Sequence, residues 1–466
     1  MSTTACETAR DEQTLPPVVG QVESCLREIL DSLAPQPTRK GRGAPMVIPS
    51  LLLWTGVIVC LLRGFRSQAQ LWRLLSLYGF WSYRRVQVSE QTVRNRLAEG
   101  GDQVKRLFEQ ITEILAGRLA PYQETDLASF ATSVVALDQV WLDPVLRTLP
   151  MLKDGKVVAQ PKLPGKLACR FDLRMQQWQK VEYLENPNEN EKLRAFKLVE
   201  DLPLGSLILC DLGYFSFRWF DELTRRGHFW ISRLREGTSY EVEHVSYEDG
   251  DTLDALIWLG KYRADRAGSL VRLVQWRVRG KLVRYITNVL EPGVLSMREI
   301  ARLYGRRWDI EMGFKLIKRD LGLHLLWSSK PAVILQQVWG VLLISQVLQA
   351  LRKEIAGRAA VDVFDVSMSL MIEAVPEFAS RGIDPVQAIV EFGRQARIIR
   401  ASRRIKMQAP TVPEEAIIPV PEGLIRERKA RYANRKCGPR PTARKAAAGQ
   451  KSRKTKPNAP DPPMSE

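Results

Sequence analysis

Two short apolar runs constrain the fold of this chain more than any other feature. Residues 133–142 read SVVALDQVWL and residues 205–215 read GSLILCDLGYF, and in each an aliphatic stretch leads directly to an aspartate. Apolar stretches of this length without alternation are typical of strands that are buried on both faces of a sheet. Each run therefore predicts a central strand that ends at its aspartate, Asp138 or Asp211. A strand-rich region followed by helices indicates an α/β fold with a mixed sheet.

The rest of the chain divides around this strand-rich region by changes in composition. The last segment is basic, contains several prolines and has almost no large apolar residues, which predicts disorder because it cannot bury enough surface to offset its ordering entropy. The predicted divisions are an N-terminal helix and linker (1–45), a helical block (46–125), an α/β core (126–355) with a β-rich insertion (about 238–288), a helical region (356–421) and a disordered basic tail (422–466).

Charge and rare residues narrow the possible functions. The chain has 70 Lys and Arg against 52 Asp and Glu, a formal net charge of +18, which favours a polyanionic partner such as nucleic acid. Its six cysteines form no C-x-x-C pair and it has only three histidines, so neither a zinc ribbon nor a His-based nucleophile is indicated. Metal chemistry would have to rest on carboxylates, which favour hard cations such as Mg²⁺.

The stretch 46–62, MVIPSLLLWTGVIVCLL, is the one candidate for a membrane segment that the sequence raises. It is close to the shortest length that spans a bilayer, and Pro49, Ser50, Thr55 and Gly56 interrupt it. A buried core helix is therefore the favoured interpretation. The polar first residues do not resemble a secretory signal, and the expected location is the cytoplasm, without a membrane partner.

Four arginines predict a basic surface at the end of the helical block. Arg84 and Arg85 precede a helix that Ser89 is expected to cap, and Arg94 and Arg96 lie on that helix. Three short helices of which the last is basic can set one helix in a DNA groove. They can equally form a plain helical subdomain with a solvated basic face, and the spacing does not separate these alternatives.

The segment 304–318, YGRRWDIEMGFKLIK, predicts a helix with two different faces. At ~100° per residue its polar positions fall within an arc of about 60°. These positions are Tyr304, Arg307, Glu311 and Lys318. A neighbouring stripe is apolar and consists of Leu303, Ile310, Phe314, Ile317 and Leu321. Such a helix can bury the apolar stripe and present the polar residues together to an adjoining cleft. An ion pair between Arg307 and Glu311, four residues apart on the helix, would also explain part of the pattern.

The two aspartates and Glu311 together suggest a carboxylate metal site. An aspartate at the end of a buried strand costs free energy unless it is paired or bound to a metal ion. Carboxyl ends of parallel strands meet at one edge of a sheet, so Asp138 and Asp211 can converge there. Three carboxylates can hold two Mg²⁺ ions about 3.5–4 Å apart and perform in-line phosphoryl transfer.

These residues also carry a family resemblance. The spacing Y-x2-R-x3-E-x6-K is met by Tyr304, Arg307, Glu311 and Lys318, and it resembles the signature of the insertion-sequence-four type of bacterial DDE transposases. The sequence around it is similar to the third catalytic block of that family, LILCDLGYF is similar to the second, and VVALDQVWL is a weaker match to the first. The likeness covers about 130–350.

The resemblance implies a ribonuclease H-like core and a cut-and-paste DNA transposase. Asp138, Asp211 and Glu311 would bind two Mg²⁺ ions, for which Mn²⁺ can substitute. Tyr304, Arg307 and Lys318 would contact phosphates of the transposon end. The implied partners are double-stranded DNA, as transposon ends and as target, and a second copy of the chain in the assembled complex.

Two departures from the family pattern leave alternatives open. Many relatives have Asp-Gly-Thr at the first aspartate, where this chain has Asp138-Gln139-Val140, and many have Asp-Arg-Gly-Tyr at the second, where Leu212 replaces the arginine. The first assignment is the less secure, with Asp143 as its substitute. A DNA-binding protein derived from a transposase but without catalysis is the alternative function.

Overall fold

The computed structural model describes residues 48–432, apart from positions 66, 81–83, 100, 143–151, 154–155, 158–164, 187, 190, 262–264, 329 and 403–407. Three predicted features lie outside the described residues: the N-terminal helix and linker, Asp143, and the tail beyond Tyr432.

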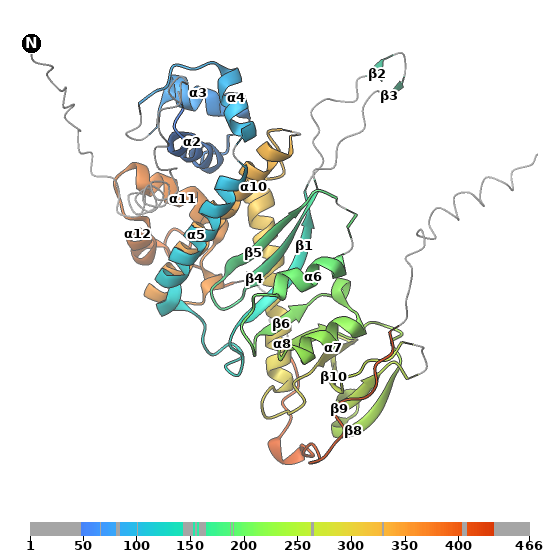
Figure 1. Ribbon diagram of the computed structural model, residues 1–466. Helices are drawn as coiled ribbons and strands as arrows, with labels where there is room; N and C mark the ends of the chain where they lie inside the picture. Colours follow the sequence, from blue (N-terminus) through green and yellow to red (C-terminus); the bar gives the residue numbers. More distant parts are fainter. Residues whose placement is uncertain are drawn as a thin grey trace, which may run out of the picture.

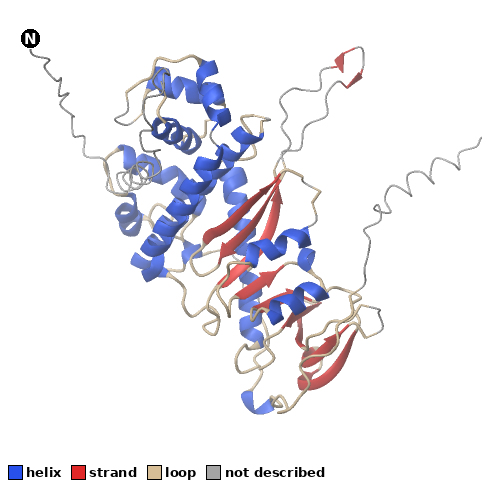
Figure 2. Ribbon diagram, viewed as in Figure 1, coloured by secondary structure: helices blue, strands red, loops and turns tan. Residues whose placement is uncertain are grey.

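A nine-stranded mixed sheet runs through the molecule, with helices on both of its faces (Figures 1 and 2). The strand order is β5-β4-β1-β6-β7-β11-β10-β9-β8, in which β1–β6 and β6–β7 are parallel pairs and the others antiparallel. The first five strands are β1 (Val134–Trp141), β4 (Lys166–Asp172), β5 (Gln177–Leu184), β6 (Leu207–Cys210) and β7 (Phe229–Arg233). A separate short hairpin consists of β2 (Leu152–Lys153) and β3 (Lys156–Val157). The predicted α/β class with a mixed sheet is confirmed.

The β-rich insertion extends this same sheet. Its strands are β8 (Tyr240–Asp249), β9 (Thr252–Leu259), β10 (Val271–Val278) and β11 (Lys281–Thr287). β11 pairs antiparallel with β7, with Ile286 opposite Ser232. The insertion is therefore joined to the central strands by main-chain hydrogen bonds.

Alternate side chains of the central strands point to opposite faces of the sheet and are buried on both of them. Val135 and Leu137 of β1 pack in one cluster with α6 (Glu191–Val199) and α7 (Phe217–Arg225). Val134 and Ala136 pack in the other cluster, with α8 (Met297–Arg306), α9 (Trp308–Lys315) and α10 (Pro331–Arg358). This two-residue period explains why the strands read as continuous apolar runs.

The helical block packs on the second of these clusters. It contains α2 (Ser50–Leu62), α3 (Gln68–Arg73), the π-helical turn η1 (Leu74–Tyr78), α4 (Glu90–Glu99), α5 (Gly101–Leu119) and the turn η2 (Ala120–Tyr122). The predicted cap at Ser89 is present, because its side chain accepts from the Thr92 amide (3.2 Å). The Ser67 side chain caps α3 in the same way by accepting from the Gln70 amide (3.3 Å). After α10 follow η5 (Val363–Asp365), α11 (Met368–Ser380), α12 (Pro385–Phe392) and η6 (Glu414–Ala416).

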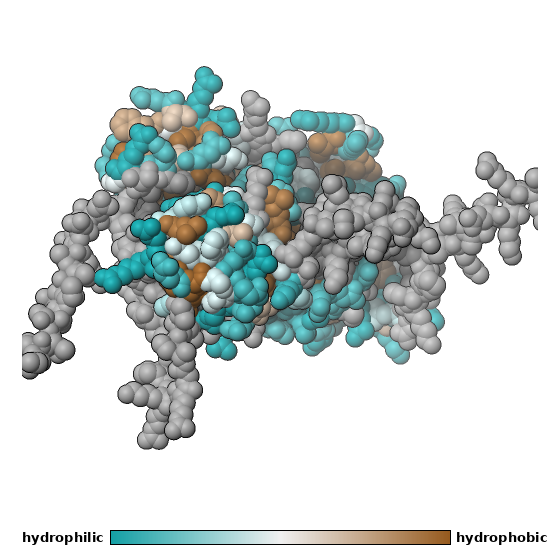
Figure 3. Space-filling model, turned by 90° about the horizontal axis from the view of Figure 1, so that it is seen from above, coloured by the Kyte–Doolittle hydropathy of each residue, from teal (hydrophilic) through white to brown (hydrophobic). Residues whose placement is uncertain are grey.

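Two apolar helices bear on the membrane question. The described residues include one helix, α10, that is long and apolar enough to cross a bilayer, and most of it is buried inside the protein. α2, which contains most of the stretch 46–62, packs against α10 and is likewise buried, with Trp54 3% and Val57 2% exposed. On the face seen in Figure 3, hydrophobic residues form separate groups that hydrophilic residues divide. Both helices are core helices in this structure.

The last described residues, 417–432, run along the insertion, and we call this segment the strap. The Ile418 amide donates to the Ser246 carbonyl (2.8 Å), and Arg431 and Arg266 exchange two main-chain hydrogen bonds (3.0 and 2.6 Å). The Arg428 guanidinium lies 4.6 Å from the Trp258 ring centroid and donates to the Leu259 carbonyl (2.9 Å). The prediction that disorder begins at residue 422 is therefore wrong for 422–432. Composition captured the lack of apolar side chains but not this main-chain pairing with a distant hairpin.

Asp221 of α7 binds the end of the β9–β10 connection and, through Tyr432, the end of the strap. Its carboxylate accepts hydrogen bonds from the Gly268 amide (2.7 Å), the Ser269 amide (2.9 Å) and the Tyr432 hydroxyl (2.7 Å).

Asp221→Ala leaves these two amides without their acceptor, so we expect the free energy of unfolding, measured by urea denaturation, to fall by about 1–3 kcal/mol. Tyr432→Phe removes only the hydroxyl contact and should cost roughly 0.5–1.5 kcal/mol. Equal losses in the two variants would contradict this role of Asp221.

Candidate active site

Asp138 and Asp211 lie side by side because their strands are parallel neighbours in register. Leu137 of β1 pairs with Cys210 of β6, and each aspartate is the next residue along the chain, Asp138 inside β1 and Asp211 directly after β6. Because successive side chains of a strand point to opposite faces of the sheet, Asp138 and Asp211 both lie on the face that packs against α8 and α9. The pairing with β6 ends there, but β1 continues against β4 as far as Trp141. The prediction that the first strand ends at its aspartate is wrong, since Asp138 lies inside β1.

The segment 304–318 is formed by three consecutive helical pieces. α8 begins at a capping box in which Ser296 and Glu299 bond reciprocally, and α9 follows after Arg307, whose dihedral angles (φ −54°, ψ −31°) remain helical. The π-helical turn η4 (Leu316–Asp320) then follows. The predicted apolar stripe is buried, with Leu303 1%, Ile310 0% and Ile317 0% exposed. The uniform 100° spacing holds as far as Glu311 and is broken by η4, which contains Lys318.

Arg307 lies among the three carboxylates of the predicted site. Its Nη2 donates to Glu311 Oε1 (2.7 Å) and lies 4.0 Å from Asp211 Oδ1, and its Nη1 lies 3.8 Å from Asp138 Oδ2. The three carboxylates come from β1, the end of β6 and α9. The structure therefore brings Asp138, Asp211, Arg307 and Glu311 together.

Tyr304 and Lys318 lie beside this group rather than within it. Tyr304 is 8% exposed and its hydroxyl donates to the Cys210 carbonyl (3.4 Å), which ties α8 to the end of β6 directly before Asp211. Its ring lies 4.7 Å from that of Tyr285. Lys318 donates from Nζ to the carbonyl of Trp141 (3.1 Å), at the far end of β1.

Burial and charge act in opposite directions on Asp138. The pKa of Asp138 is raised to about 7, with burial as the largest cause. The Gln139 amide and the Arg307 charge lower this pKa, whereas the charges of Asp211 and Glu311 raise it. The Gln139 amide donates to Asp138 Oδ1 at 2.7 Å. A partly buried carboxylate with two others nearby is stabilised in its ionised form by a positive charge, which Arg307 supplies in this structure.

The donor set suits a hard divalent cation. Three carboxylates face one positive charge, and oxygen ligands of this type are what Mg²⁺ prefers. Within the described residues, no group of three or more His, Cys, Asp and Glu side chains is placed closely enough to hold a metal ion as the side chains stand. The positive group at the centre of the site is the Arg307 guanidinium.

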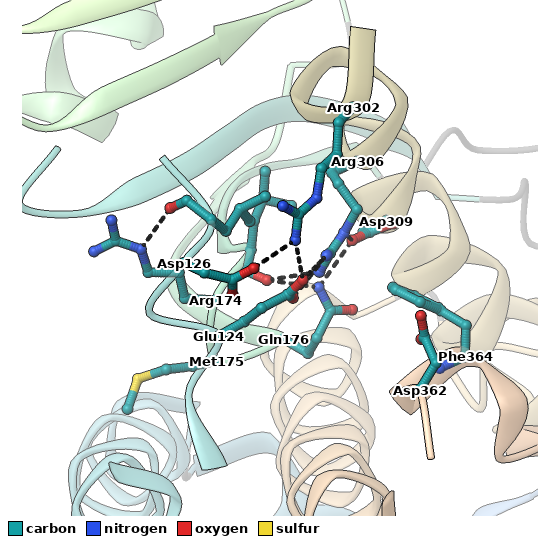
Figure 4. A network of polar contacts seen from close by, with 12 residues as sticks. Glu124, Asp126, Arg174, Met175, Gln176, Arg302, Arg306, Asp309, Asp362 and Phe364 are labelled. Carbon is teal, nitrogen blue, oxygen red and sulfur yellow. Dashed lines mark hydrogen bonds and ion pairs between the residues drawn. The ribbon is translucent and has the colours of Figure 1, made fainter. Parts of the chain in front are cut away.

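The neighbouring Arg306 belongs to a different network of ion pairs and hydrogen bonds, shown in Figure 4. It is 7% exposed and donates to both oxygens of Glu124 (2.7 and 2.6 Å). It also donates to Asp309 Oδ2 (2.7 Å) and to the Leu173 carbonyl (3.0 Å). Arg302, one turn earlier, joins Glu124 and Asp126 (3.2 and 3.0 Å). These contacts fix α8 to the segment before β1 and so place Arg307 opposite the aspartates.

The four arginines of the helical block lie on the surface, and several of them form ion pairs or hydrogen bonds within the block. Arg94 pairs with Glu90 (2.5 Å) and Arg96 with Glu99 (2.9 Å), both on α4 itself. Arg84 and Arg85 are exposed in the preceding loop, where Arg85 donates to the Leu77 carbonyl (3.2 Å). Part of the positive charge of α4 is thus balanced within the helix.

Sequence reasoning missed two exposed apolar residues next to the site. Trp308 and Met312 of α9 are 56% and 57% exposed and follow Arg307 and Glu311 by one residue each. The Arg307 guanidinium carbon lies 5.7 Å from the centroid of the Trp308 ring. Their signal in the sequence is that both are large apolar residues that fall outside the buried stripe.

Comparison with known proteins adds to this geometry. Residues 163–347 match the family described as the transposase DDE domain, a span that includes Asp211, Glu311 and the helices around Arg307 but begins after Asp138. The chain is 28% identical over 186 residues to the transposase InsG for insertion sequence element IS4 of Escherichia coli (strain K12), covering 38% of this chain and 42% of the relative. It is 22% identical over 278 residues to the transposase for insertion sequence element IS231B of Bacillus thuringiensis subsp. berliner, covering 45% and 57%.

A solved structure of a piggyBac transposase synaptic complex with hairpin DNA is also similar, at 10% identity and a TM-score of 0.41, covering 88% of this chain and 89% of that one. The matched regions span roughly half the length of the curated relatives.

The family match gives first the class that the central region resembles, since residues 163–347 match the transposase DDE domain. The family match and the relatives then confirm the more specific prediction from the sequence: the chain is related to the insertion-sequence-four type of DDE transposases.

Proposed function

We propose that this protein is a DNA transposase that cleaves the ends of its element and joins them to target DNA by a cut-and-paste mechanism. One observation carries the proposal: three carboxylates from three separate elements converge on the guanidinium of Arg307. Asp138, Asp211 and Glu311 are the proposed catalytic residues. The relatives named as transposases support the same activity.

The proposed cofactor is Mg²⁺, as two ions for which Mn²⁺ can substitute, held by Asp138, Asp211 and Glu311. When bound, such ions activate an attacking oxygen and stabilise the leaving oxygen of the phosphodiester. The protein contributes the placement of the three carboxylates, through the register of β1 against β6 and through the docking of α9. It also contributes positive charge next to the phosphate that reacts.

The predicted phosphate contacts receive unequal support. Arg307 borders the carboxylates and Lys318 lies along β1, so both can meet a DNA backbone that enters the site. Tyr304 is buried against Cys210, and this supports a role in holding α8 in place. For binding outside the site we propose the loop with Arg84 and Arg85, followed by Arg94 and Arg96 on α4.

We propose a ribonuclease H-like core for the central domain, residues 126–355. Support comes from the order β5-β4-β1-β6-β7, in which antiparallel strands precede parallel ones and the carboxylates lie where β1 and β6 meet. The helical block (46–125), the helical region (356–421) and the N-terminal segment (1–45) remain the proposed divisions around it. We further propose a dimer in the complex with DNA and a cytoplasmic location.

The alternative, a DNA-binding protein without catalysis, has less support. A protein that had lost catalysis would have no reason to retain all three acidic residues, and here they are brought to one site. The surplus of positive charge is common to both functions.

The test is cleavage of a supercoiled plasmid that carries the DNA flanking the gene, with Mg²⁺ and with EDTA. We expect nicks at the element ends with Mg²⁺ and none with EDTA, because the carboxylates alone cannot activate water for attack on a phosphodiester. Gel analysis with end mapping gives the result. DNA binding without cleavage, in Mg²⁺ and in Mn²⁺, would favour the alternative.

A further inference from the structure

Arg307 occupies the position in which a positive ion is expected. Its two terminal nitrogens lie within 4.0 Å of an oxygen of each of Asp138, Asp211 and Glu311. Three carboxylates gathered this closely repel one another unless a cation lies among them. In this structure the arginine therefore stabilises the arrangement that a metal ion would otherwise hold.

The same guanidinium is incompletely hydrogen-bonded. The Arg307 side chain is 12% exposed, and its Nε and Nη1 are buried without a hydrogen-bond partner among the described residues. A buried donor without an acceptor costs about 1–3 kcal/mol. Its neighbour Arg306, by contrast, uses Nε, Nη1 and Nη2 in hydrogen bonds. Arg307 thus retains donors for an acceptor that is not part of the described protein, and a phosphate has the bidentate geometry that suits them.

We propose that Arg307 and divalent cations compete for the same carboxylates. In the metal-free protein Arg307 is bonded to Glu311 and neutralises the site. When cations bind, the hydrogen bond between Arg307 and Glu311 breaks, and the guanidinium becomes free to donate to a DNA phosphate. This inference rests on the metal site of the proposed function and adds an order of binding to it.

Competition at Glu311 couples two binding events. A cation that releases Arg307 makes the arginine available to DNA, and DNA that holds Arg307 makes Glu311 available to the cation. By linkage each ligand then raises the affinity for the other by the same factor. Arg307 therefore delays metal binding until DNA is present.

The experiment measures Mn²⁺ binding to the full-length protein without DNA, from the electron paramagnetic resonance signal of free Mn²⁺. We expect Arg307→Gln to bind Mn²⁺ about tenfold more tightly than the wild type, because one charge-assisted hydrogen bond no longer has to be broken. The matched control is Arg298→Gln, which removes an exposed arginine of α8 that has no part in the network around Arg306 described above. Its Mn²⁺ affinity should equal that of the wild type.

A second measurement compares binding of duplex DNA from the gene's flanking sequence with and without Mn²⁺. The wild type should bind this DNA more tightly when Mn²⁺ is present, and Arg307→Gln should lose most of that gain. If Arg307→Gln does not fold by circular dichroism, Arg307→Lys replaces it, since lysine keeps the charge but cannot reach several carboxylates at once. We then expect tighter Mn²⁺ binding by Arg307→Lys than by the wild type.

Unchanged or weaker Mn²⁺ binding by the folded variant would overturn the competition and leave the proposed function intact. If the wild type bound no Mn²⁺ with or without DNA, the metal site itself would be wrong and both proposals would fall.

Discussion

Single replacement of Asp211 or Glu311 by Ala is expected to reduce DNA cleavage and strand joining by about 10³-fold or more, because each replacement removes a ligand of the two proposed Mg²⁺ ions. DNA binding should persist, since the basic loop at Arg84 and Arg85 lies on other elements. Cleavage is measured on the plasmid substrate and binding by gel shift. Wild-type cleavage by either variant would show that the three-carboxylate mechanism is wrong.

The first carboxylate calls for a paired comparison. Asp138 lies in register with Asp211 next to Arg307, whereas its substitute Asp143 lies outside the described residues. Asp138→Ala should behave like the other two variants, and Asp143→Ala should cleave DNA like the wild type. The reverse pattern would transfer the catalytic role to Asp143.

Replacement of Arg306 by Met is expected to have the largest effect on stability. Arg306 is buried and binds Glu124, Asp309 and the Leu173 carbonyl, and Asp309 is itself only 3% exposed. Removing one partner of a buried ion pair leaves an uncompensated charge, at a cost of about 3–5 kcal/mol. The shift of the urea denaturation midpoint measures this loss.

Arg302→Met is the control for this loss. Arg302 belongs to the same network and shares Glu124 with Arg306, but its side chain is 47% exposed, and an exposed pair contributes about 0–1 kcal/mol. A similar loss in both variants would show that the network does not depend on the buried arginine.

The sequence was sufficient for features that depend on local pattern. The buried strands, the insertion and the apolar stripe of residues 303–321 all follow from runs and periods within a few residues. The convergence of Asp138 with Asp211 could also be expected, because parallel strands present their carboxyl ends together.

Features that depend on distant partners could not be predicted. Arg306 and Arg307 are adjacent and identical, and only the packing of α8 against Glu124 assigns one to a structural network and the other to the carboxylates. Tyr304 is buried because Tyr285 and Cys210 cover it, and neither lies near it in the sequence. The π-helical turn that contains Lys318 changes the helical spacing after α9, and the uniform 100° period did not predict it.

The strap covers an apolar cluster that is exposed until the end of the chain has been translated. Val420 and Leu424 cover the apolar cluster of Leu256, Trp258, Leu270 and Leu290 on the insertion. During synthesis that cluster leaves the ribosome well before its cover does, so it is exposed while the remaining chain is translated. A product that stopped short of residue 420 would keep this surface uncovered and would be a ready target for proteases and chaperones.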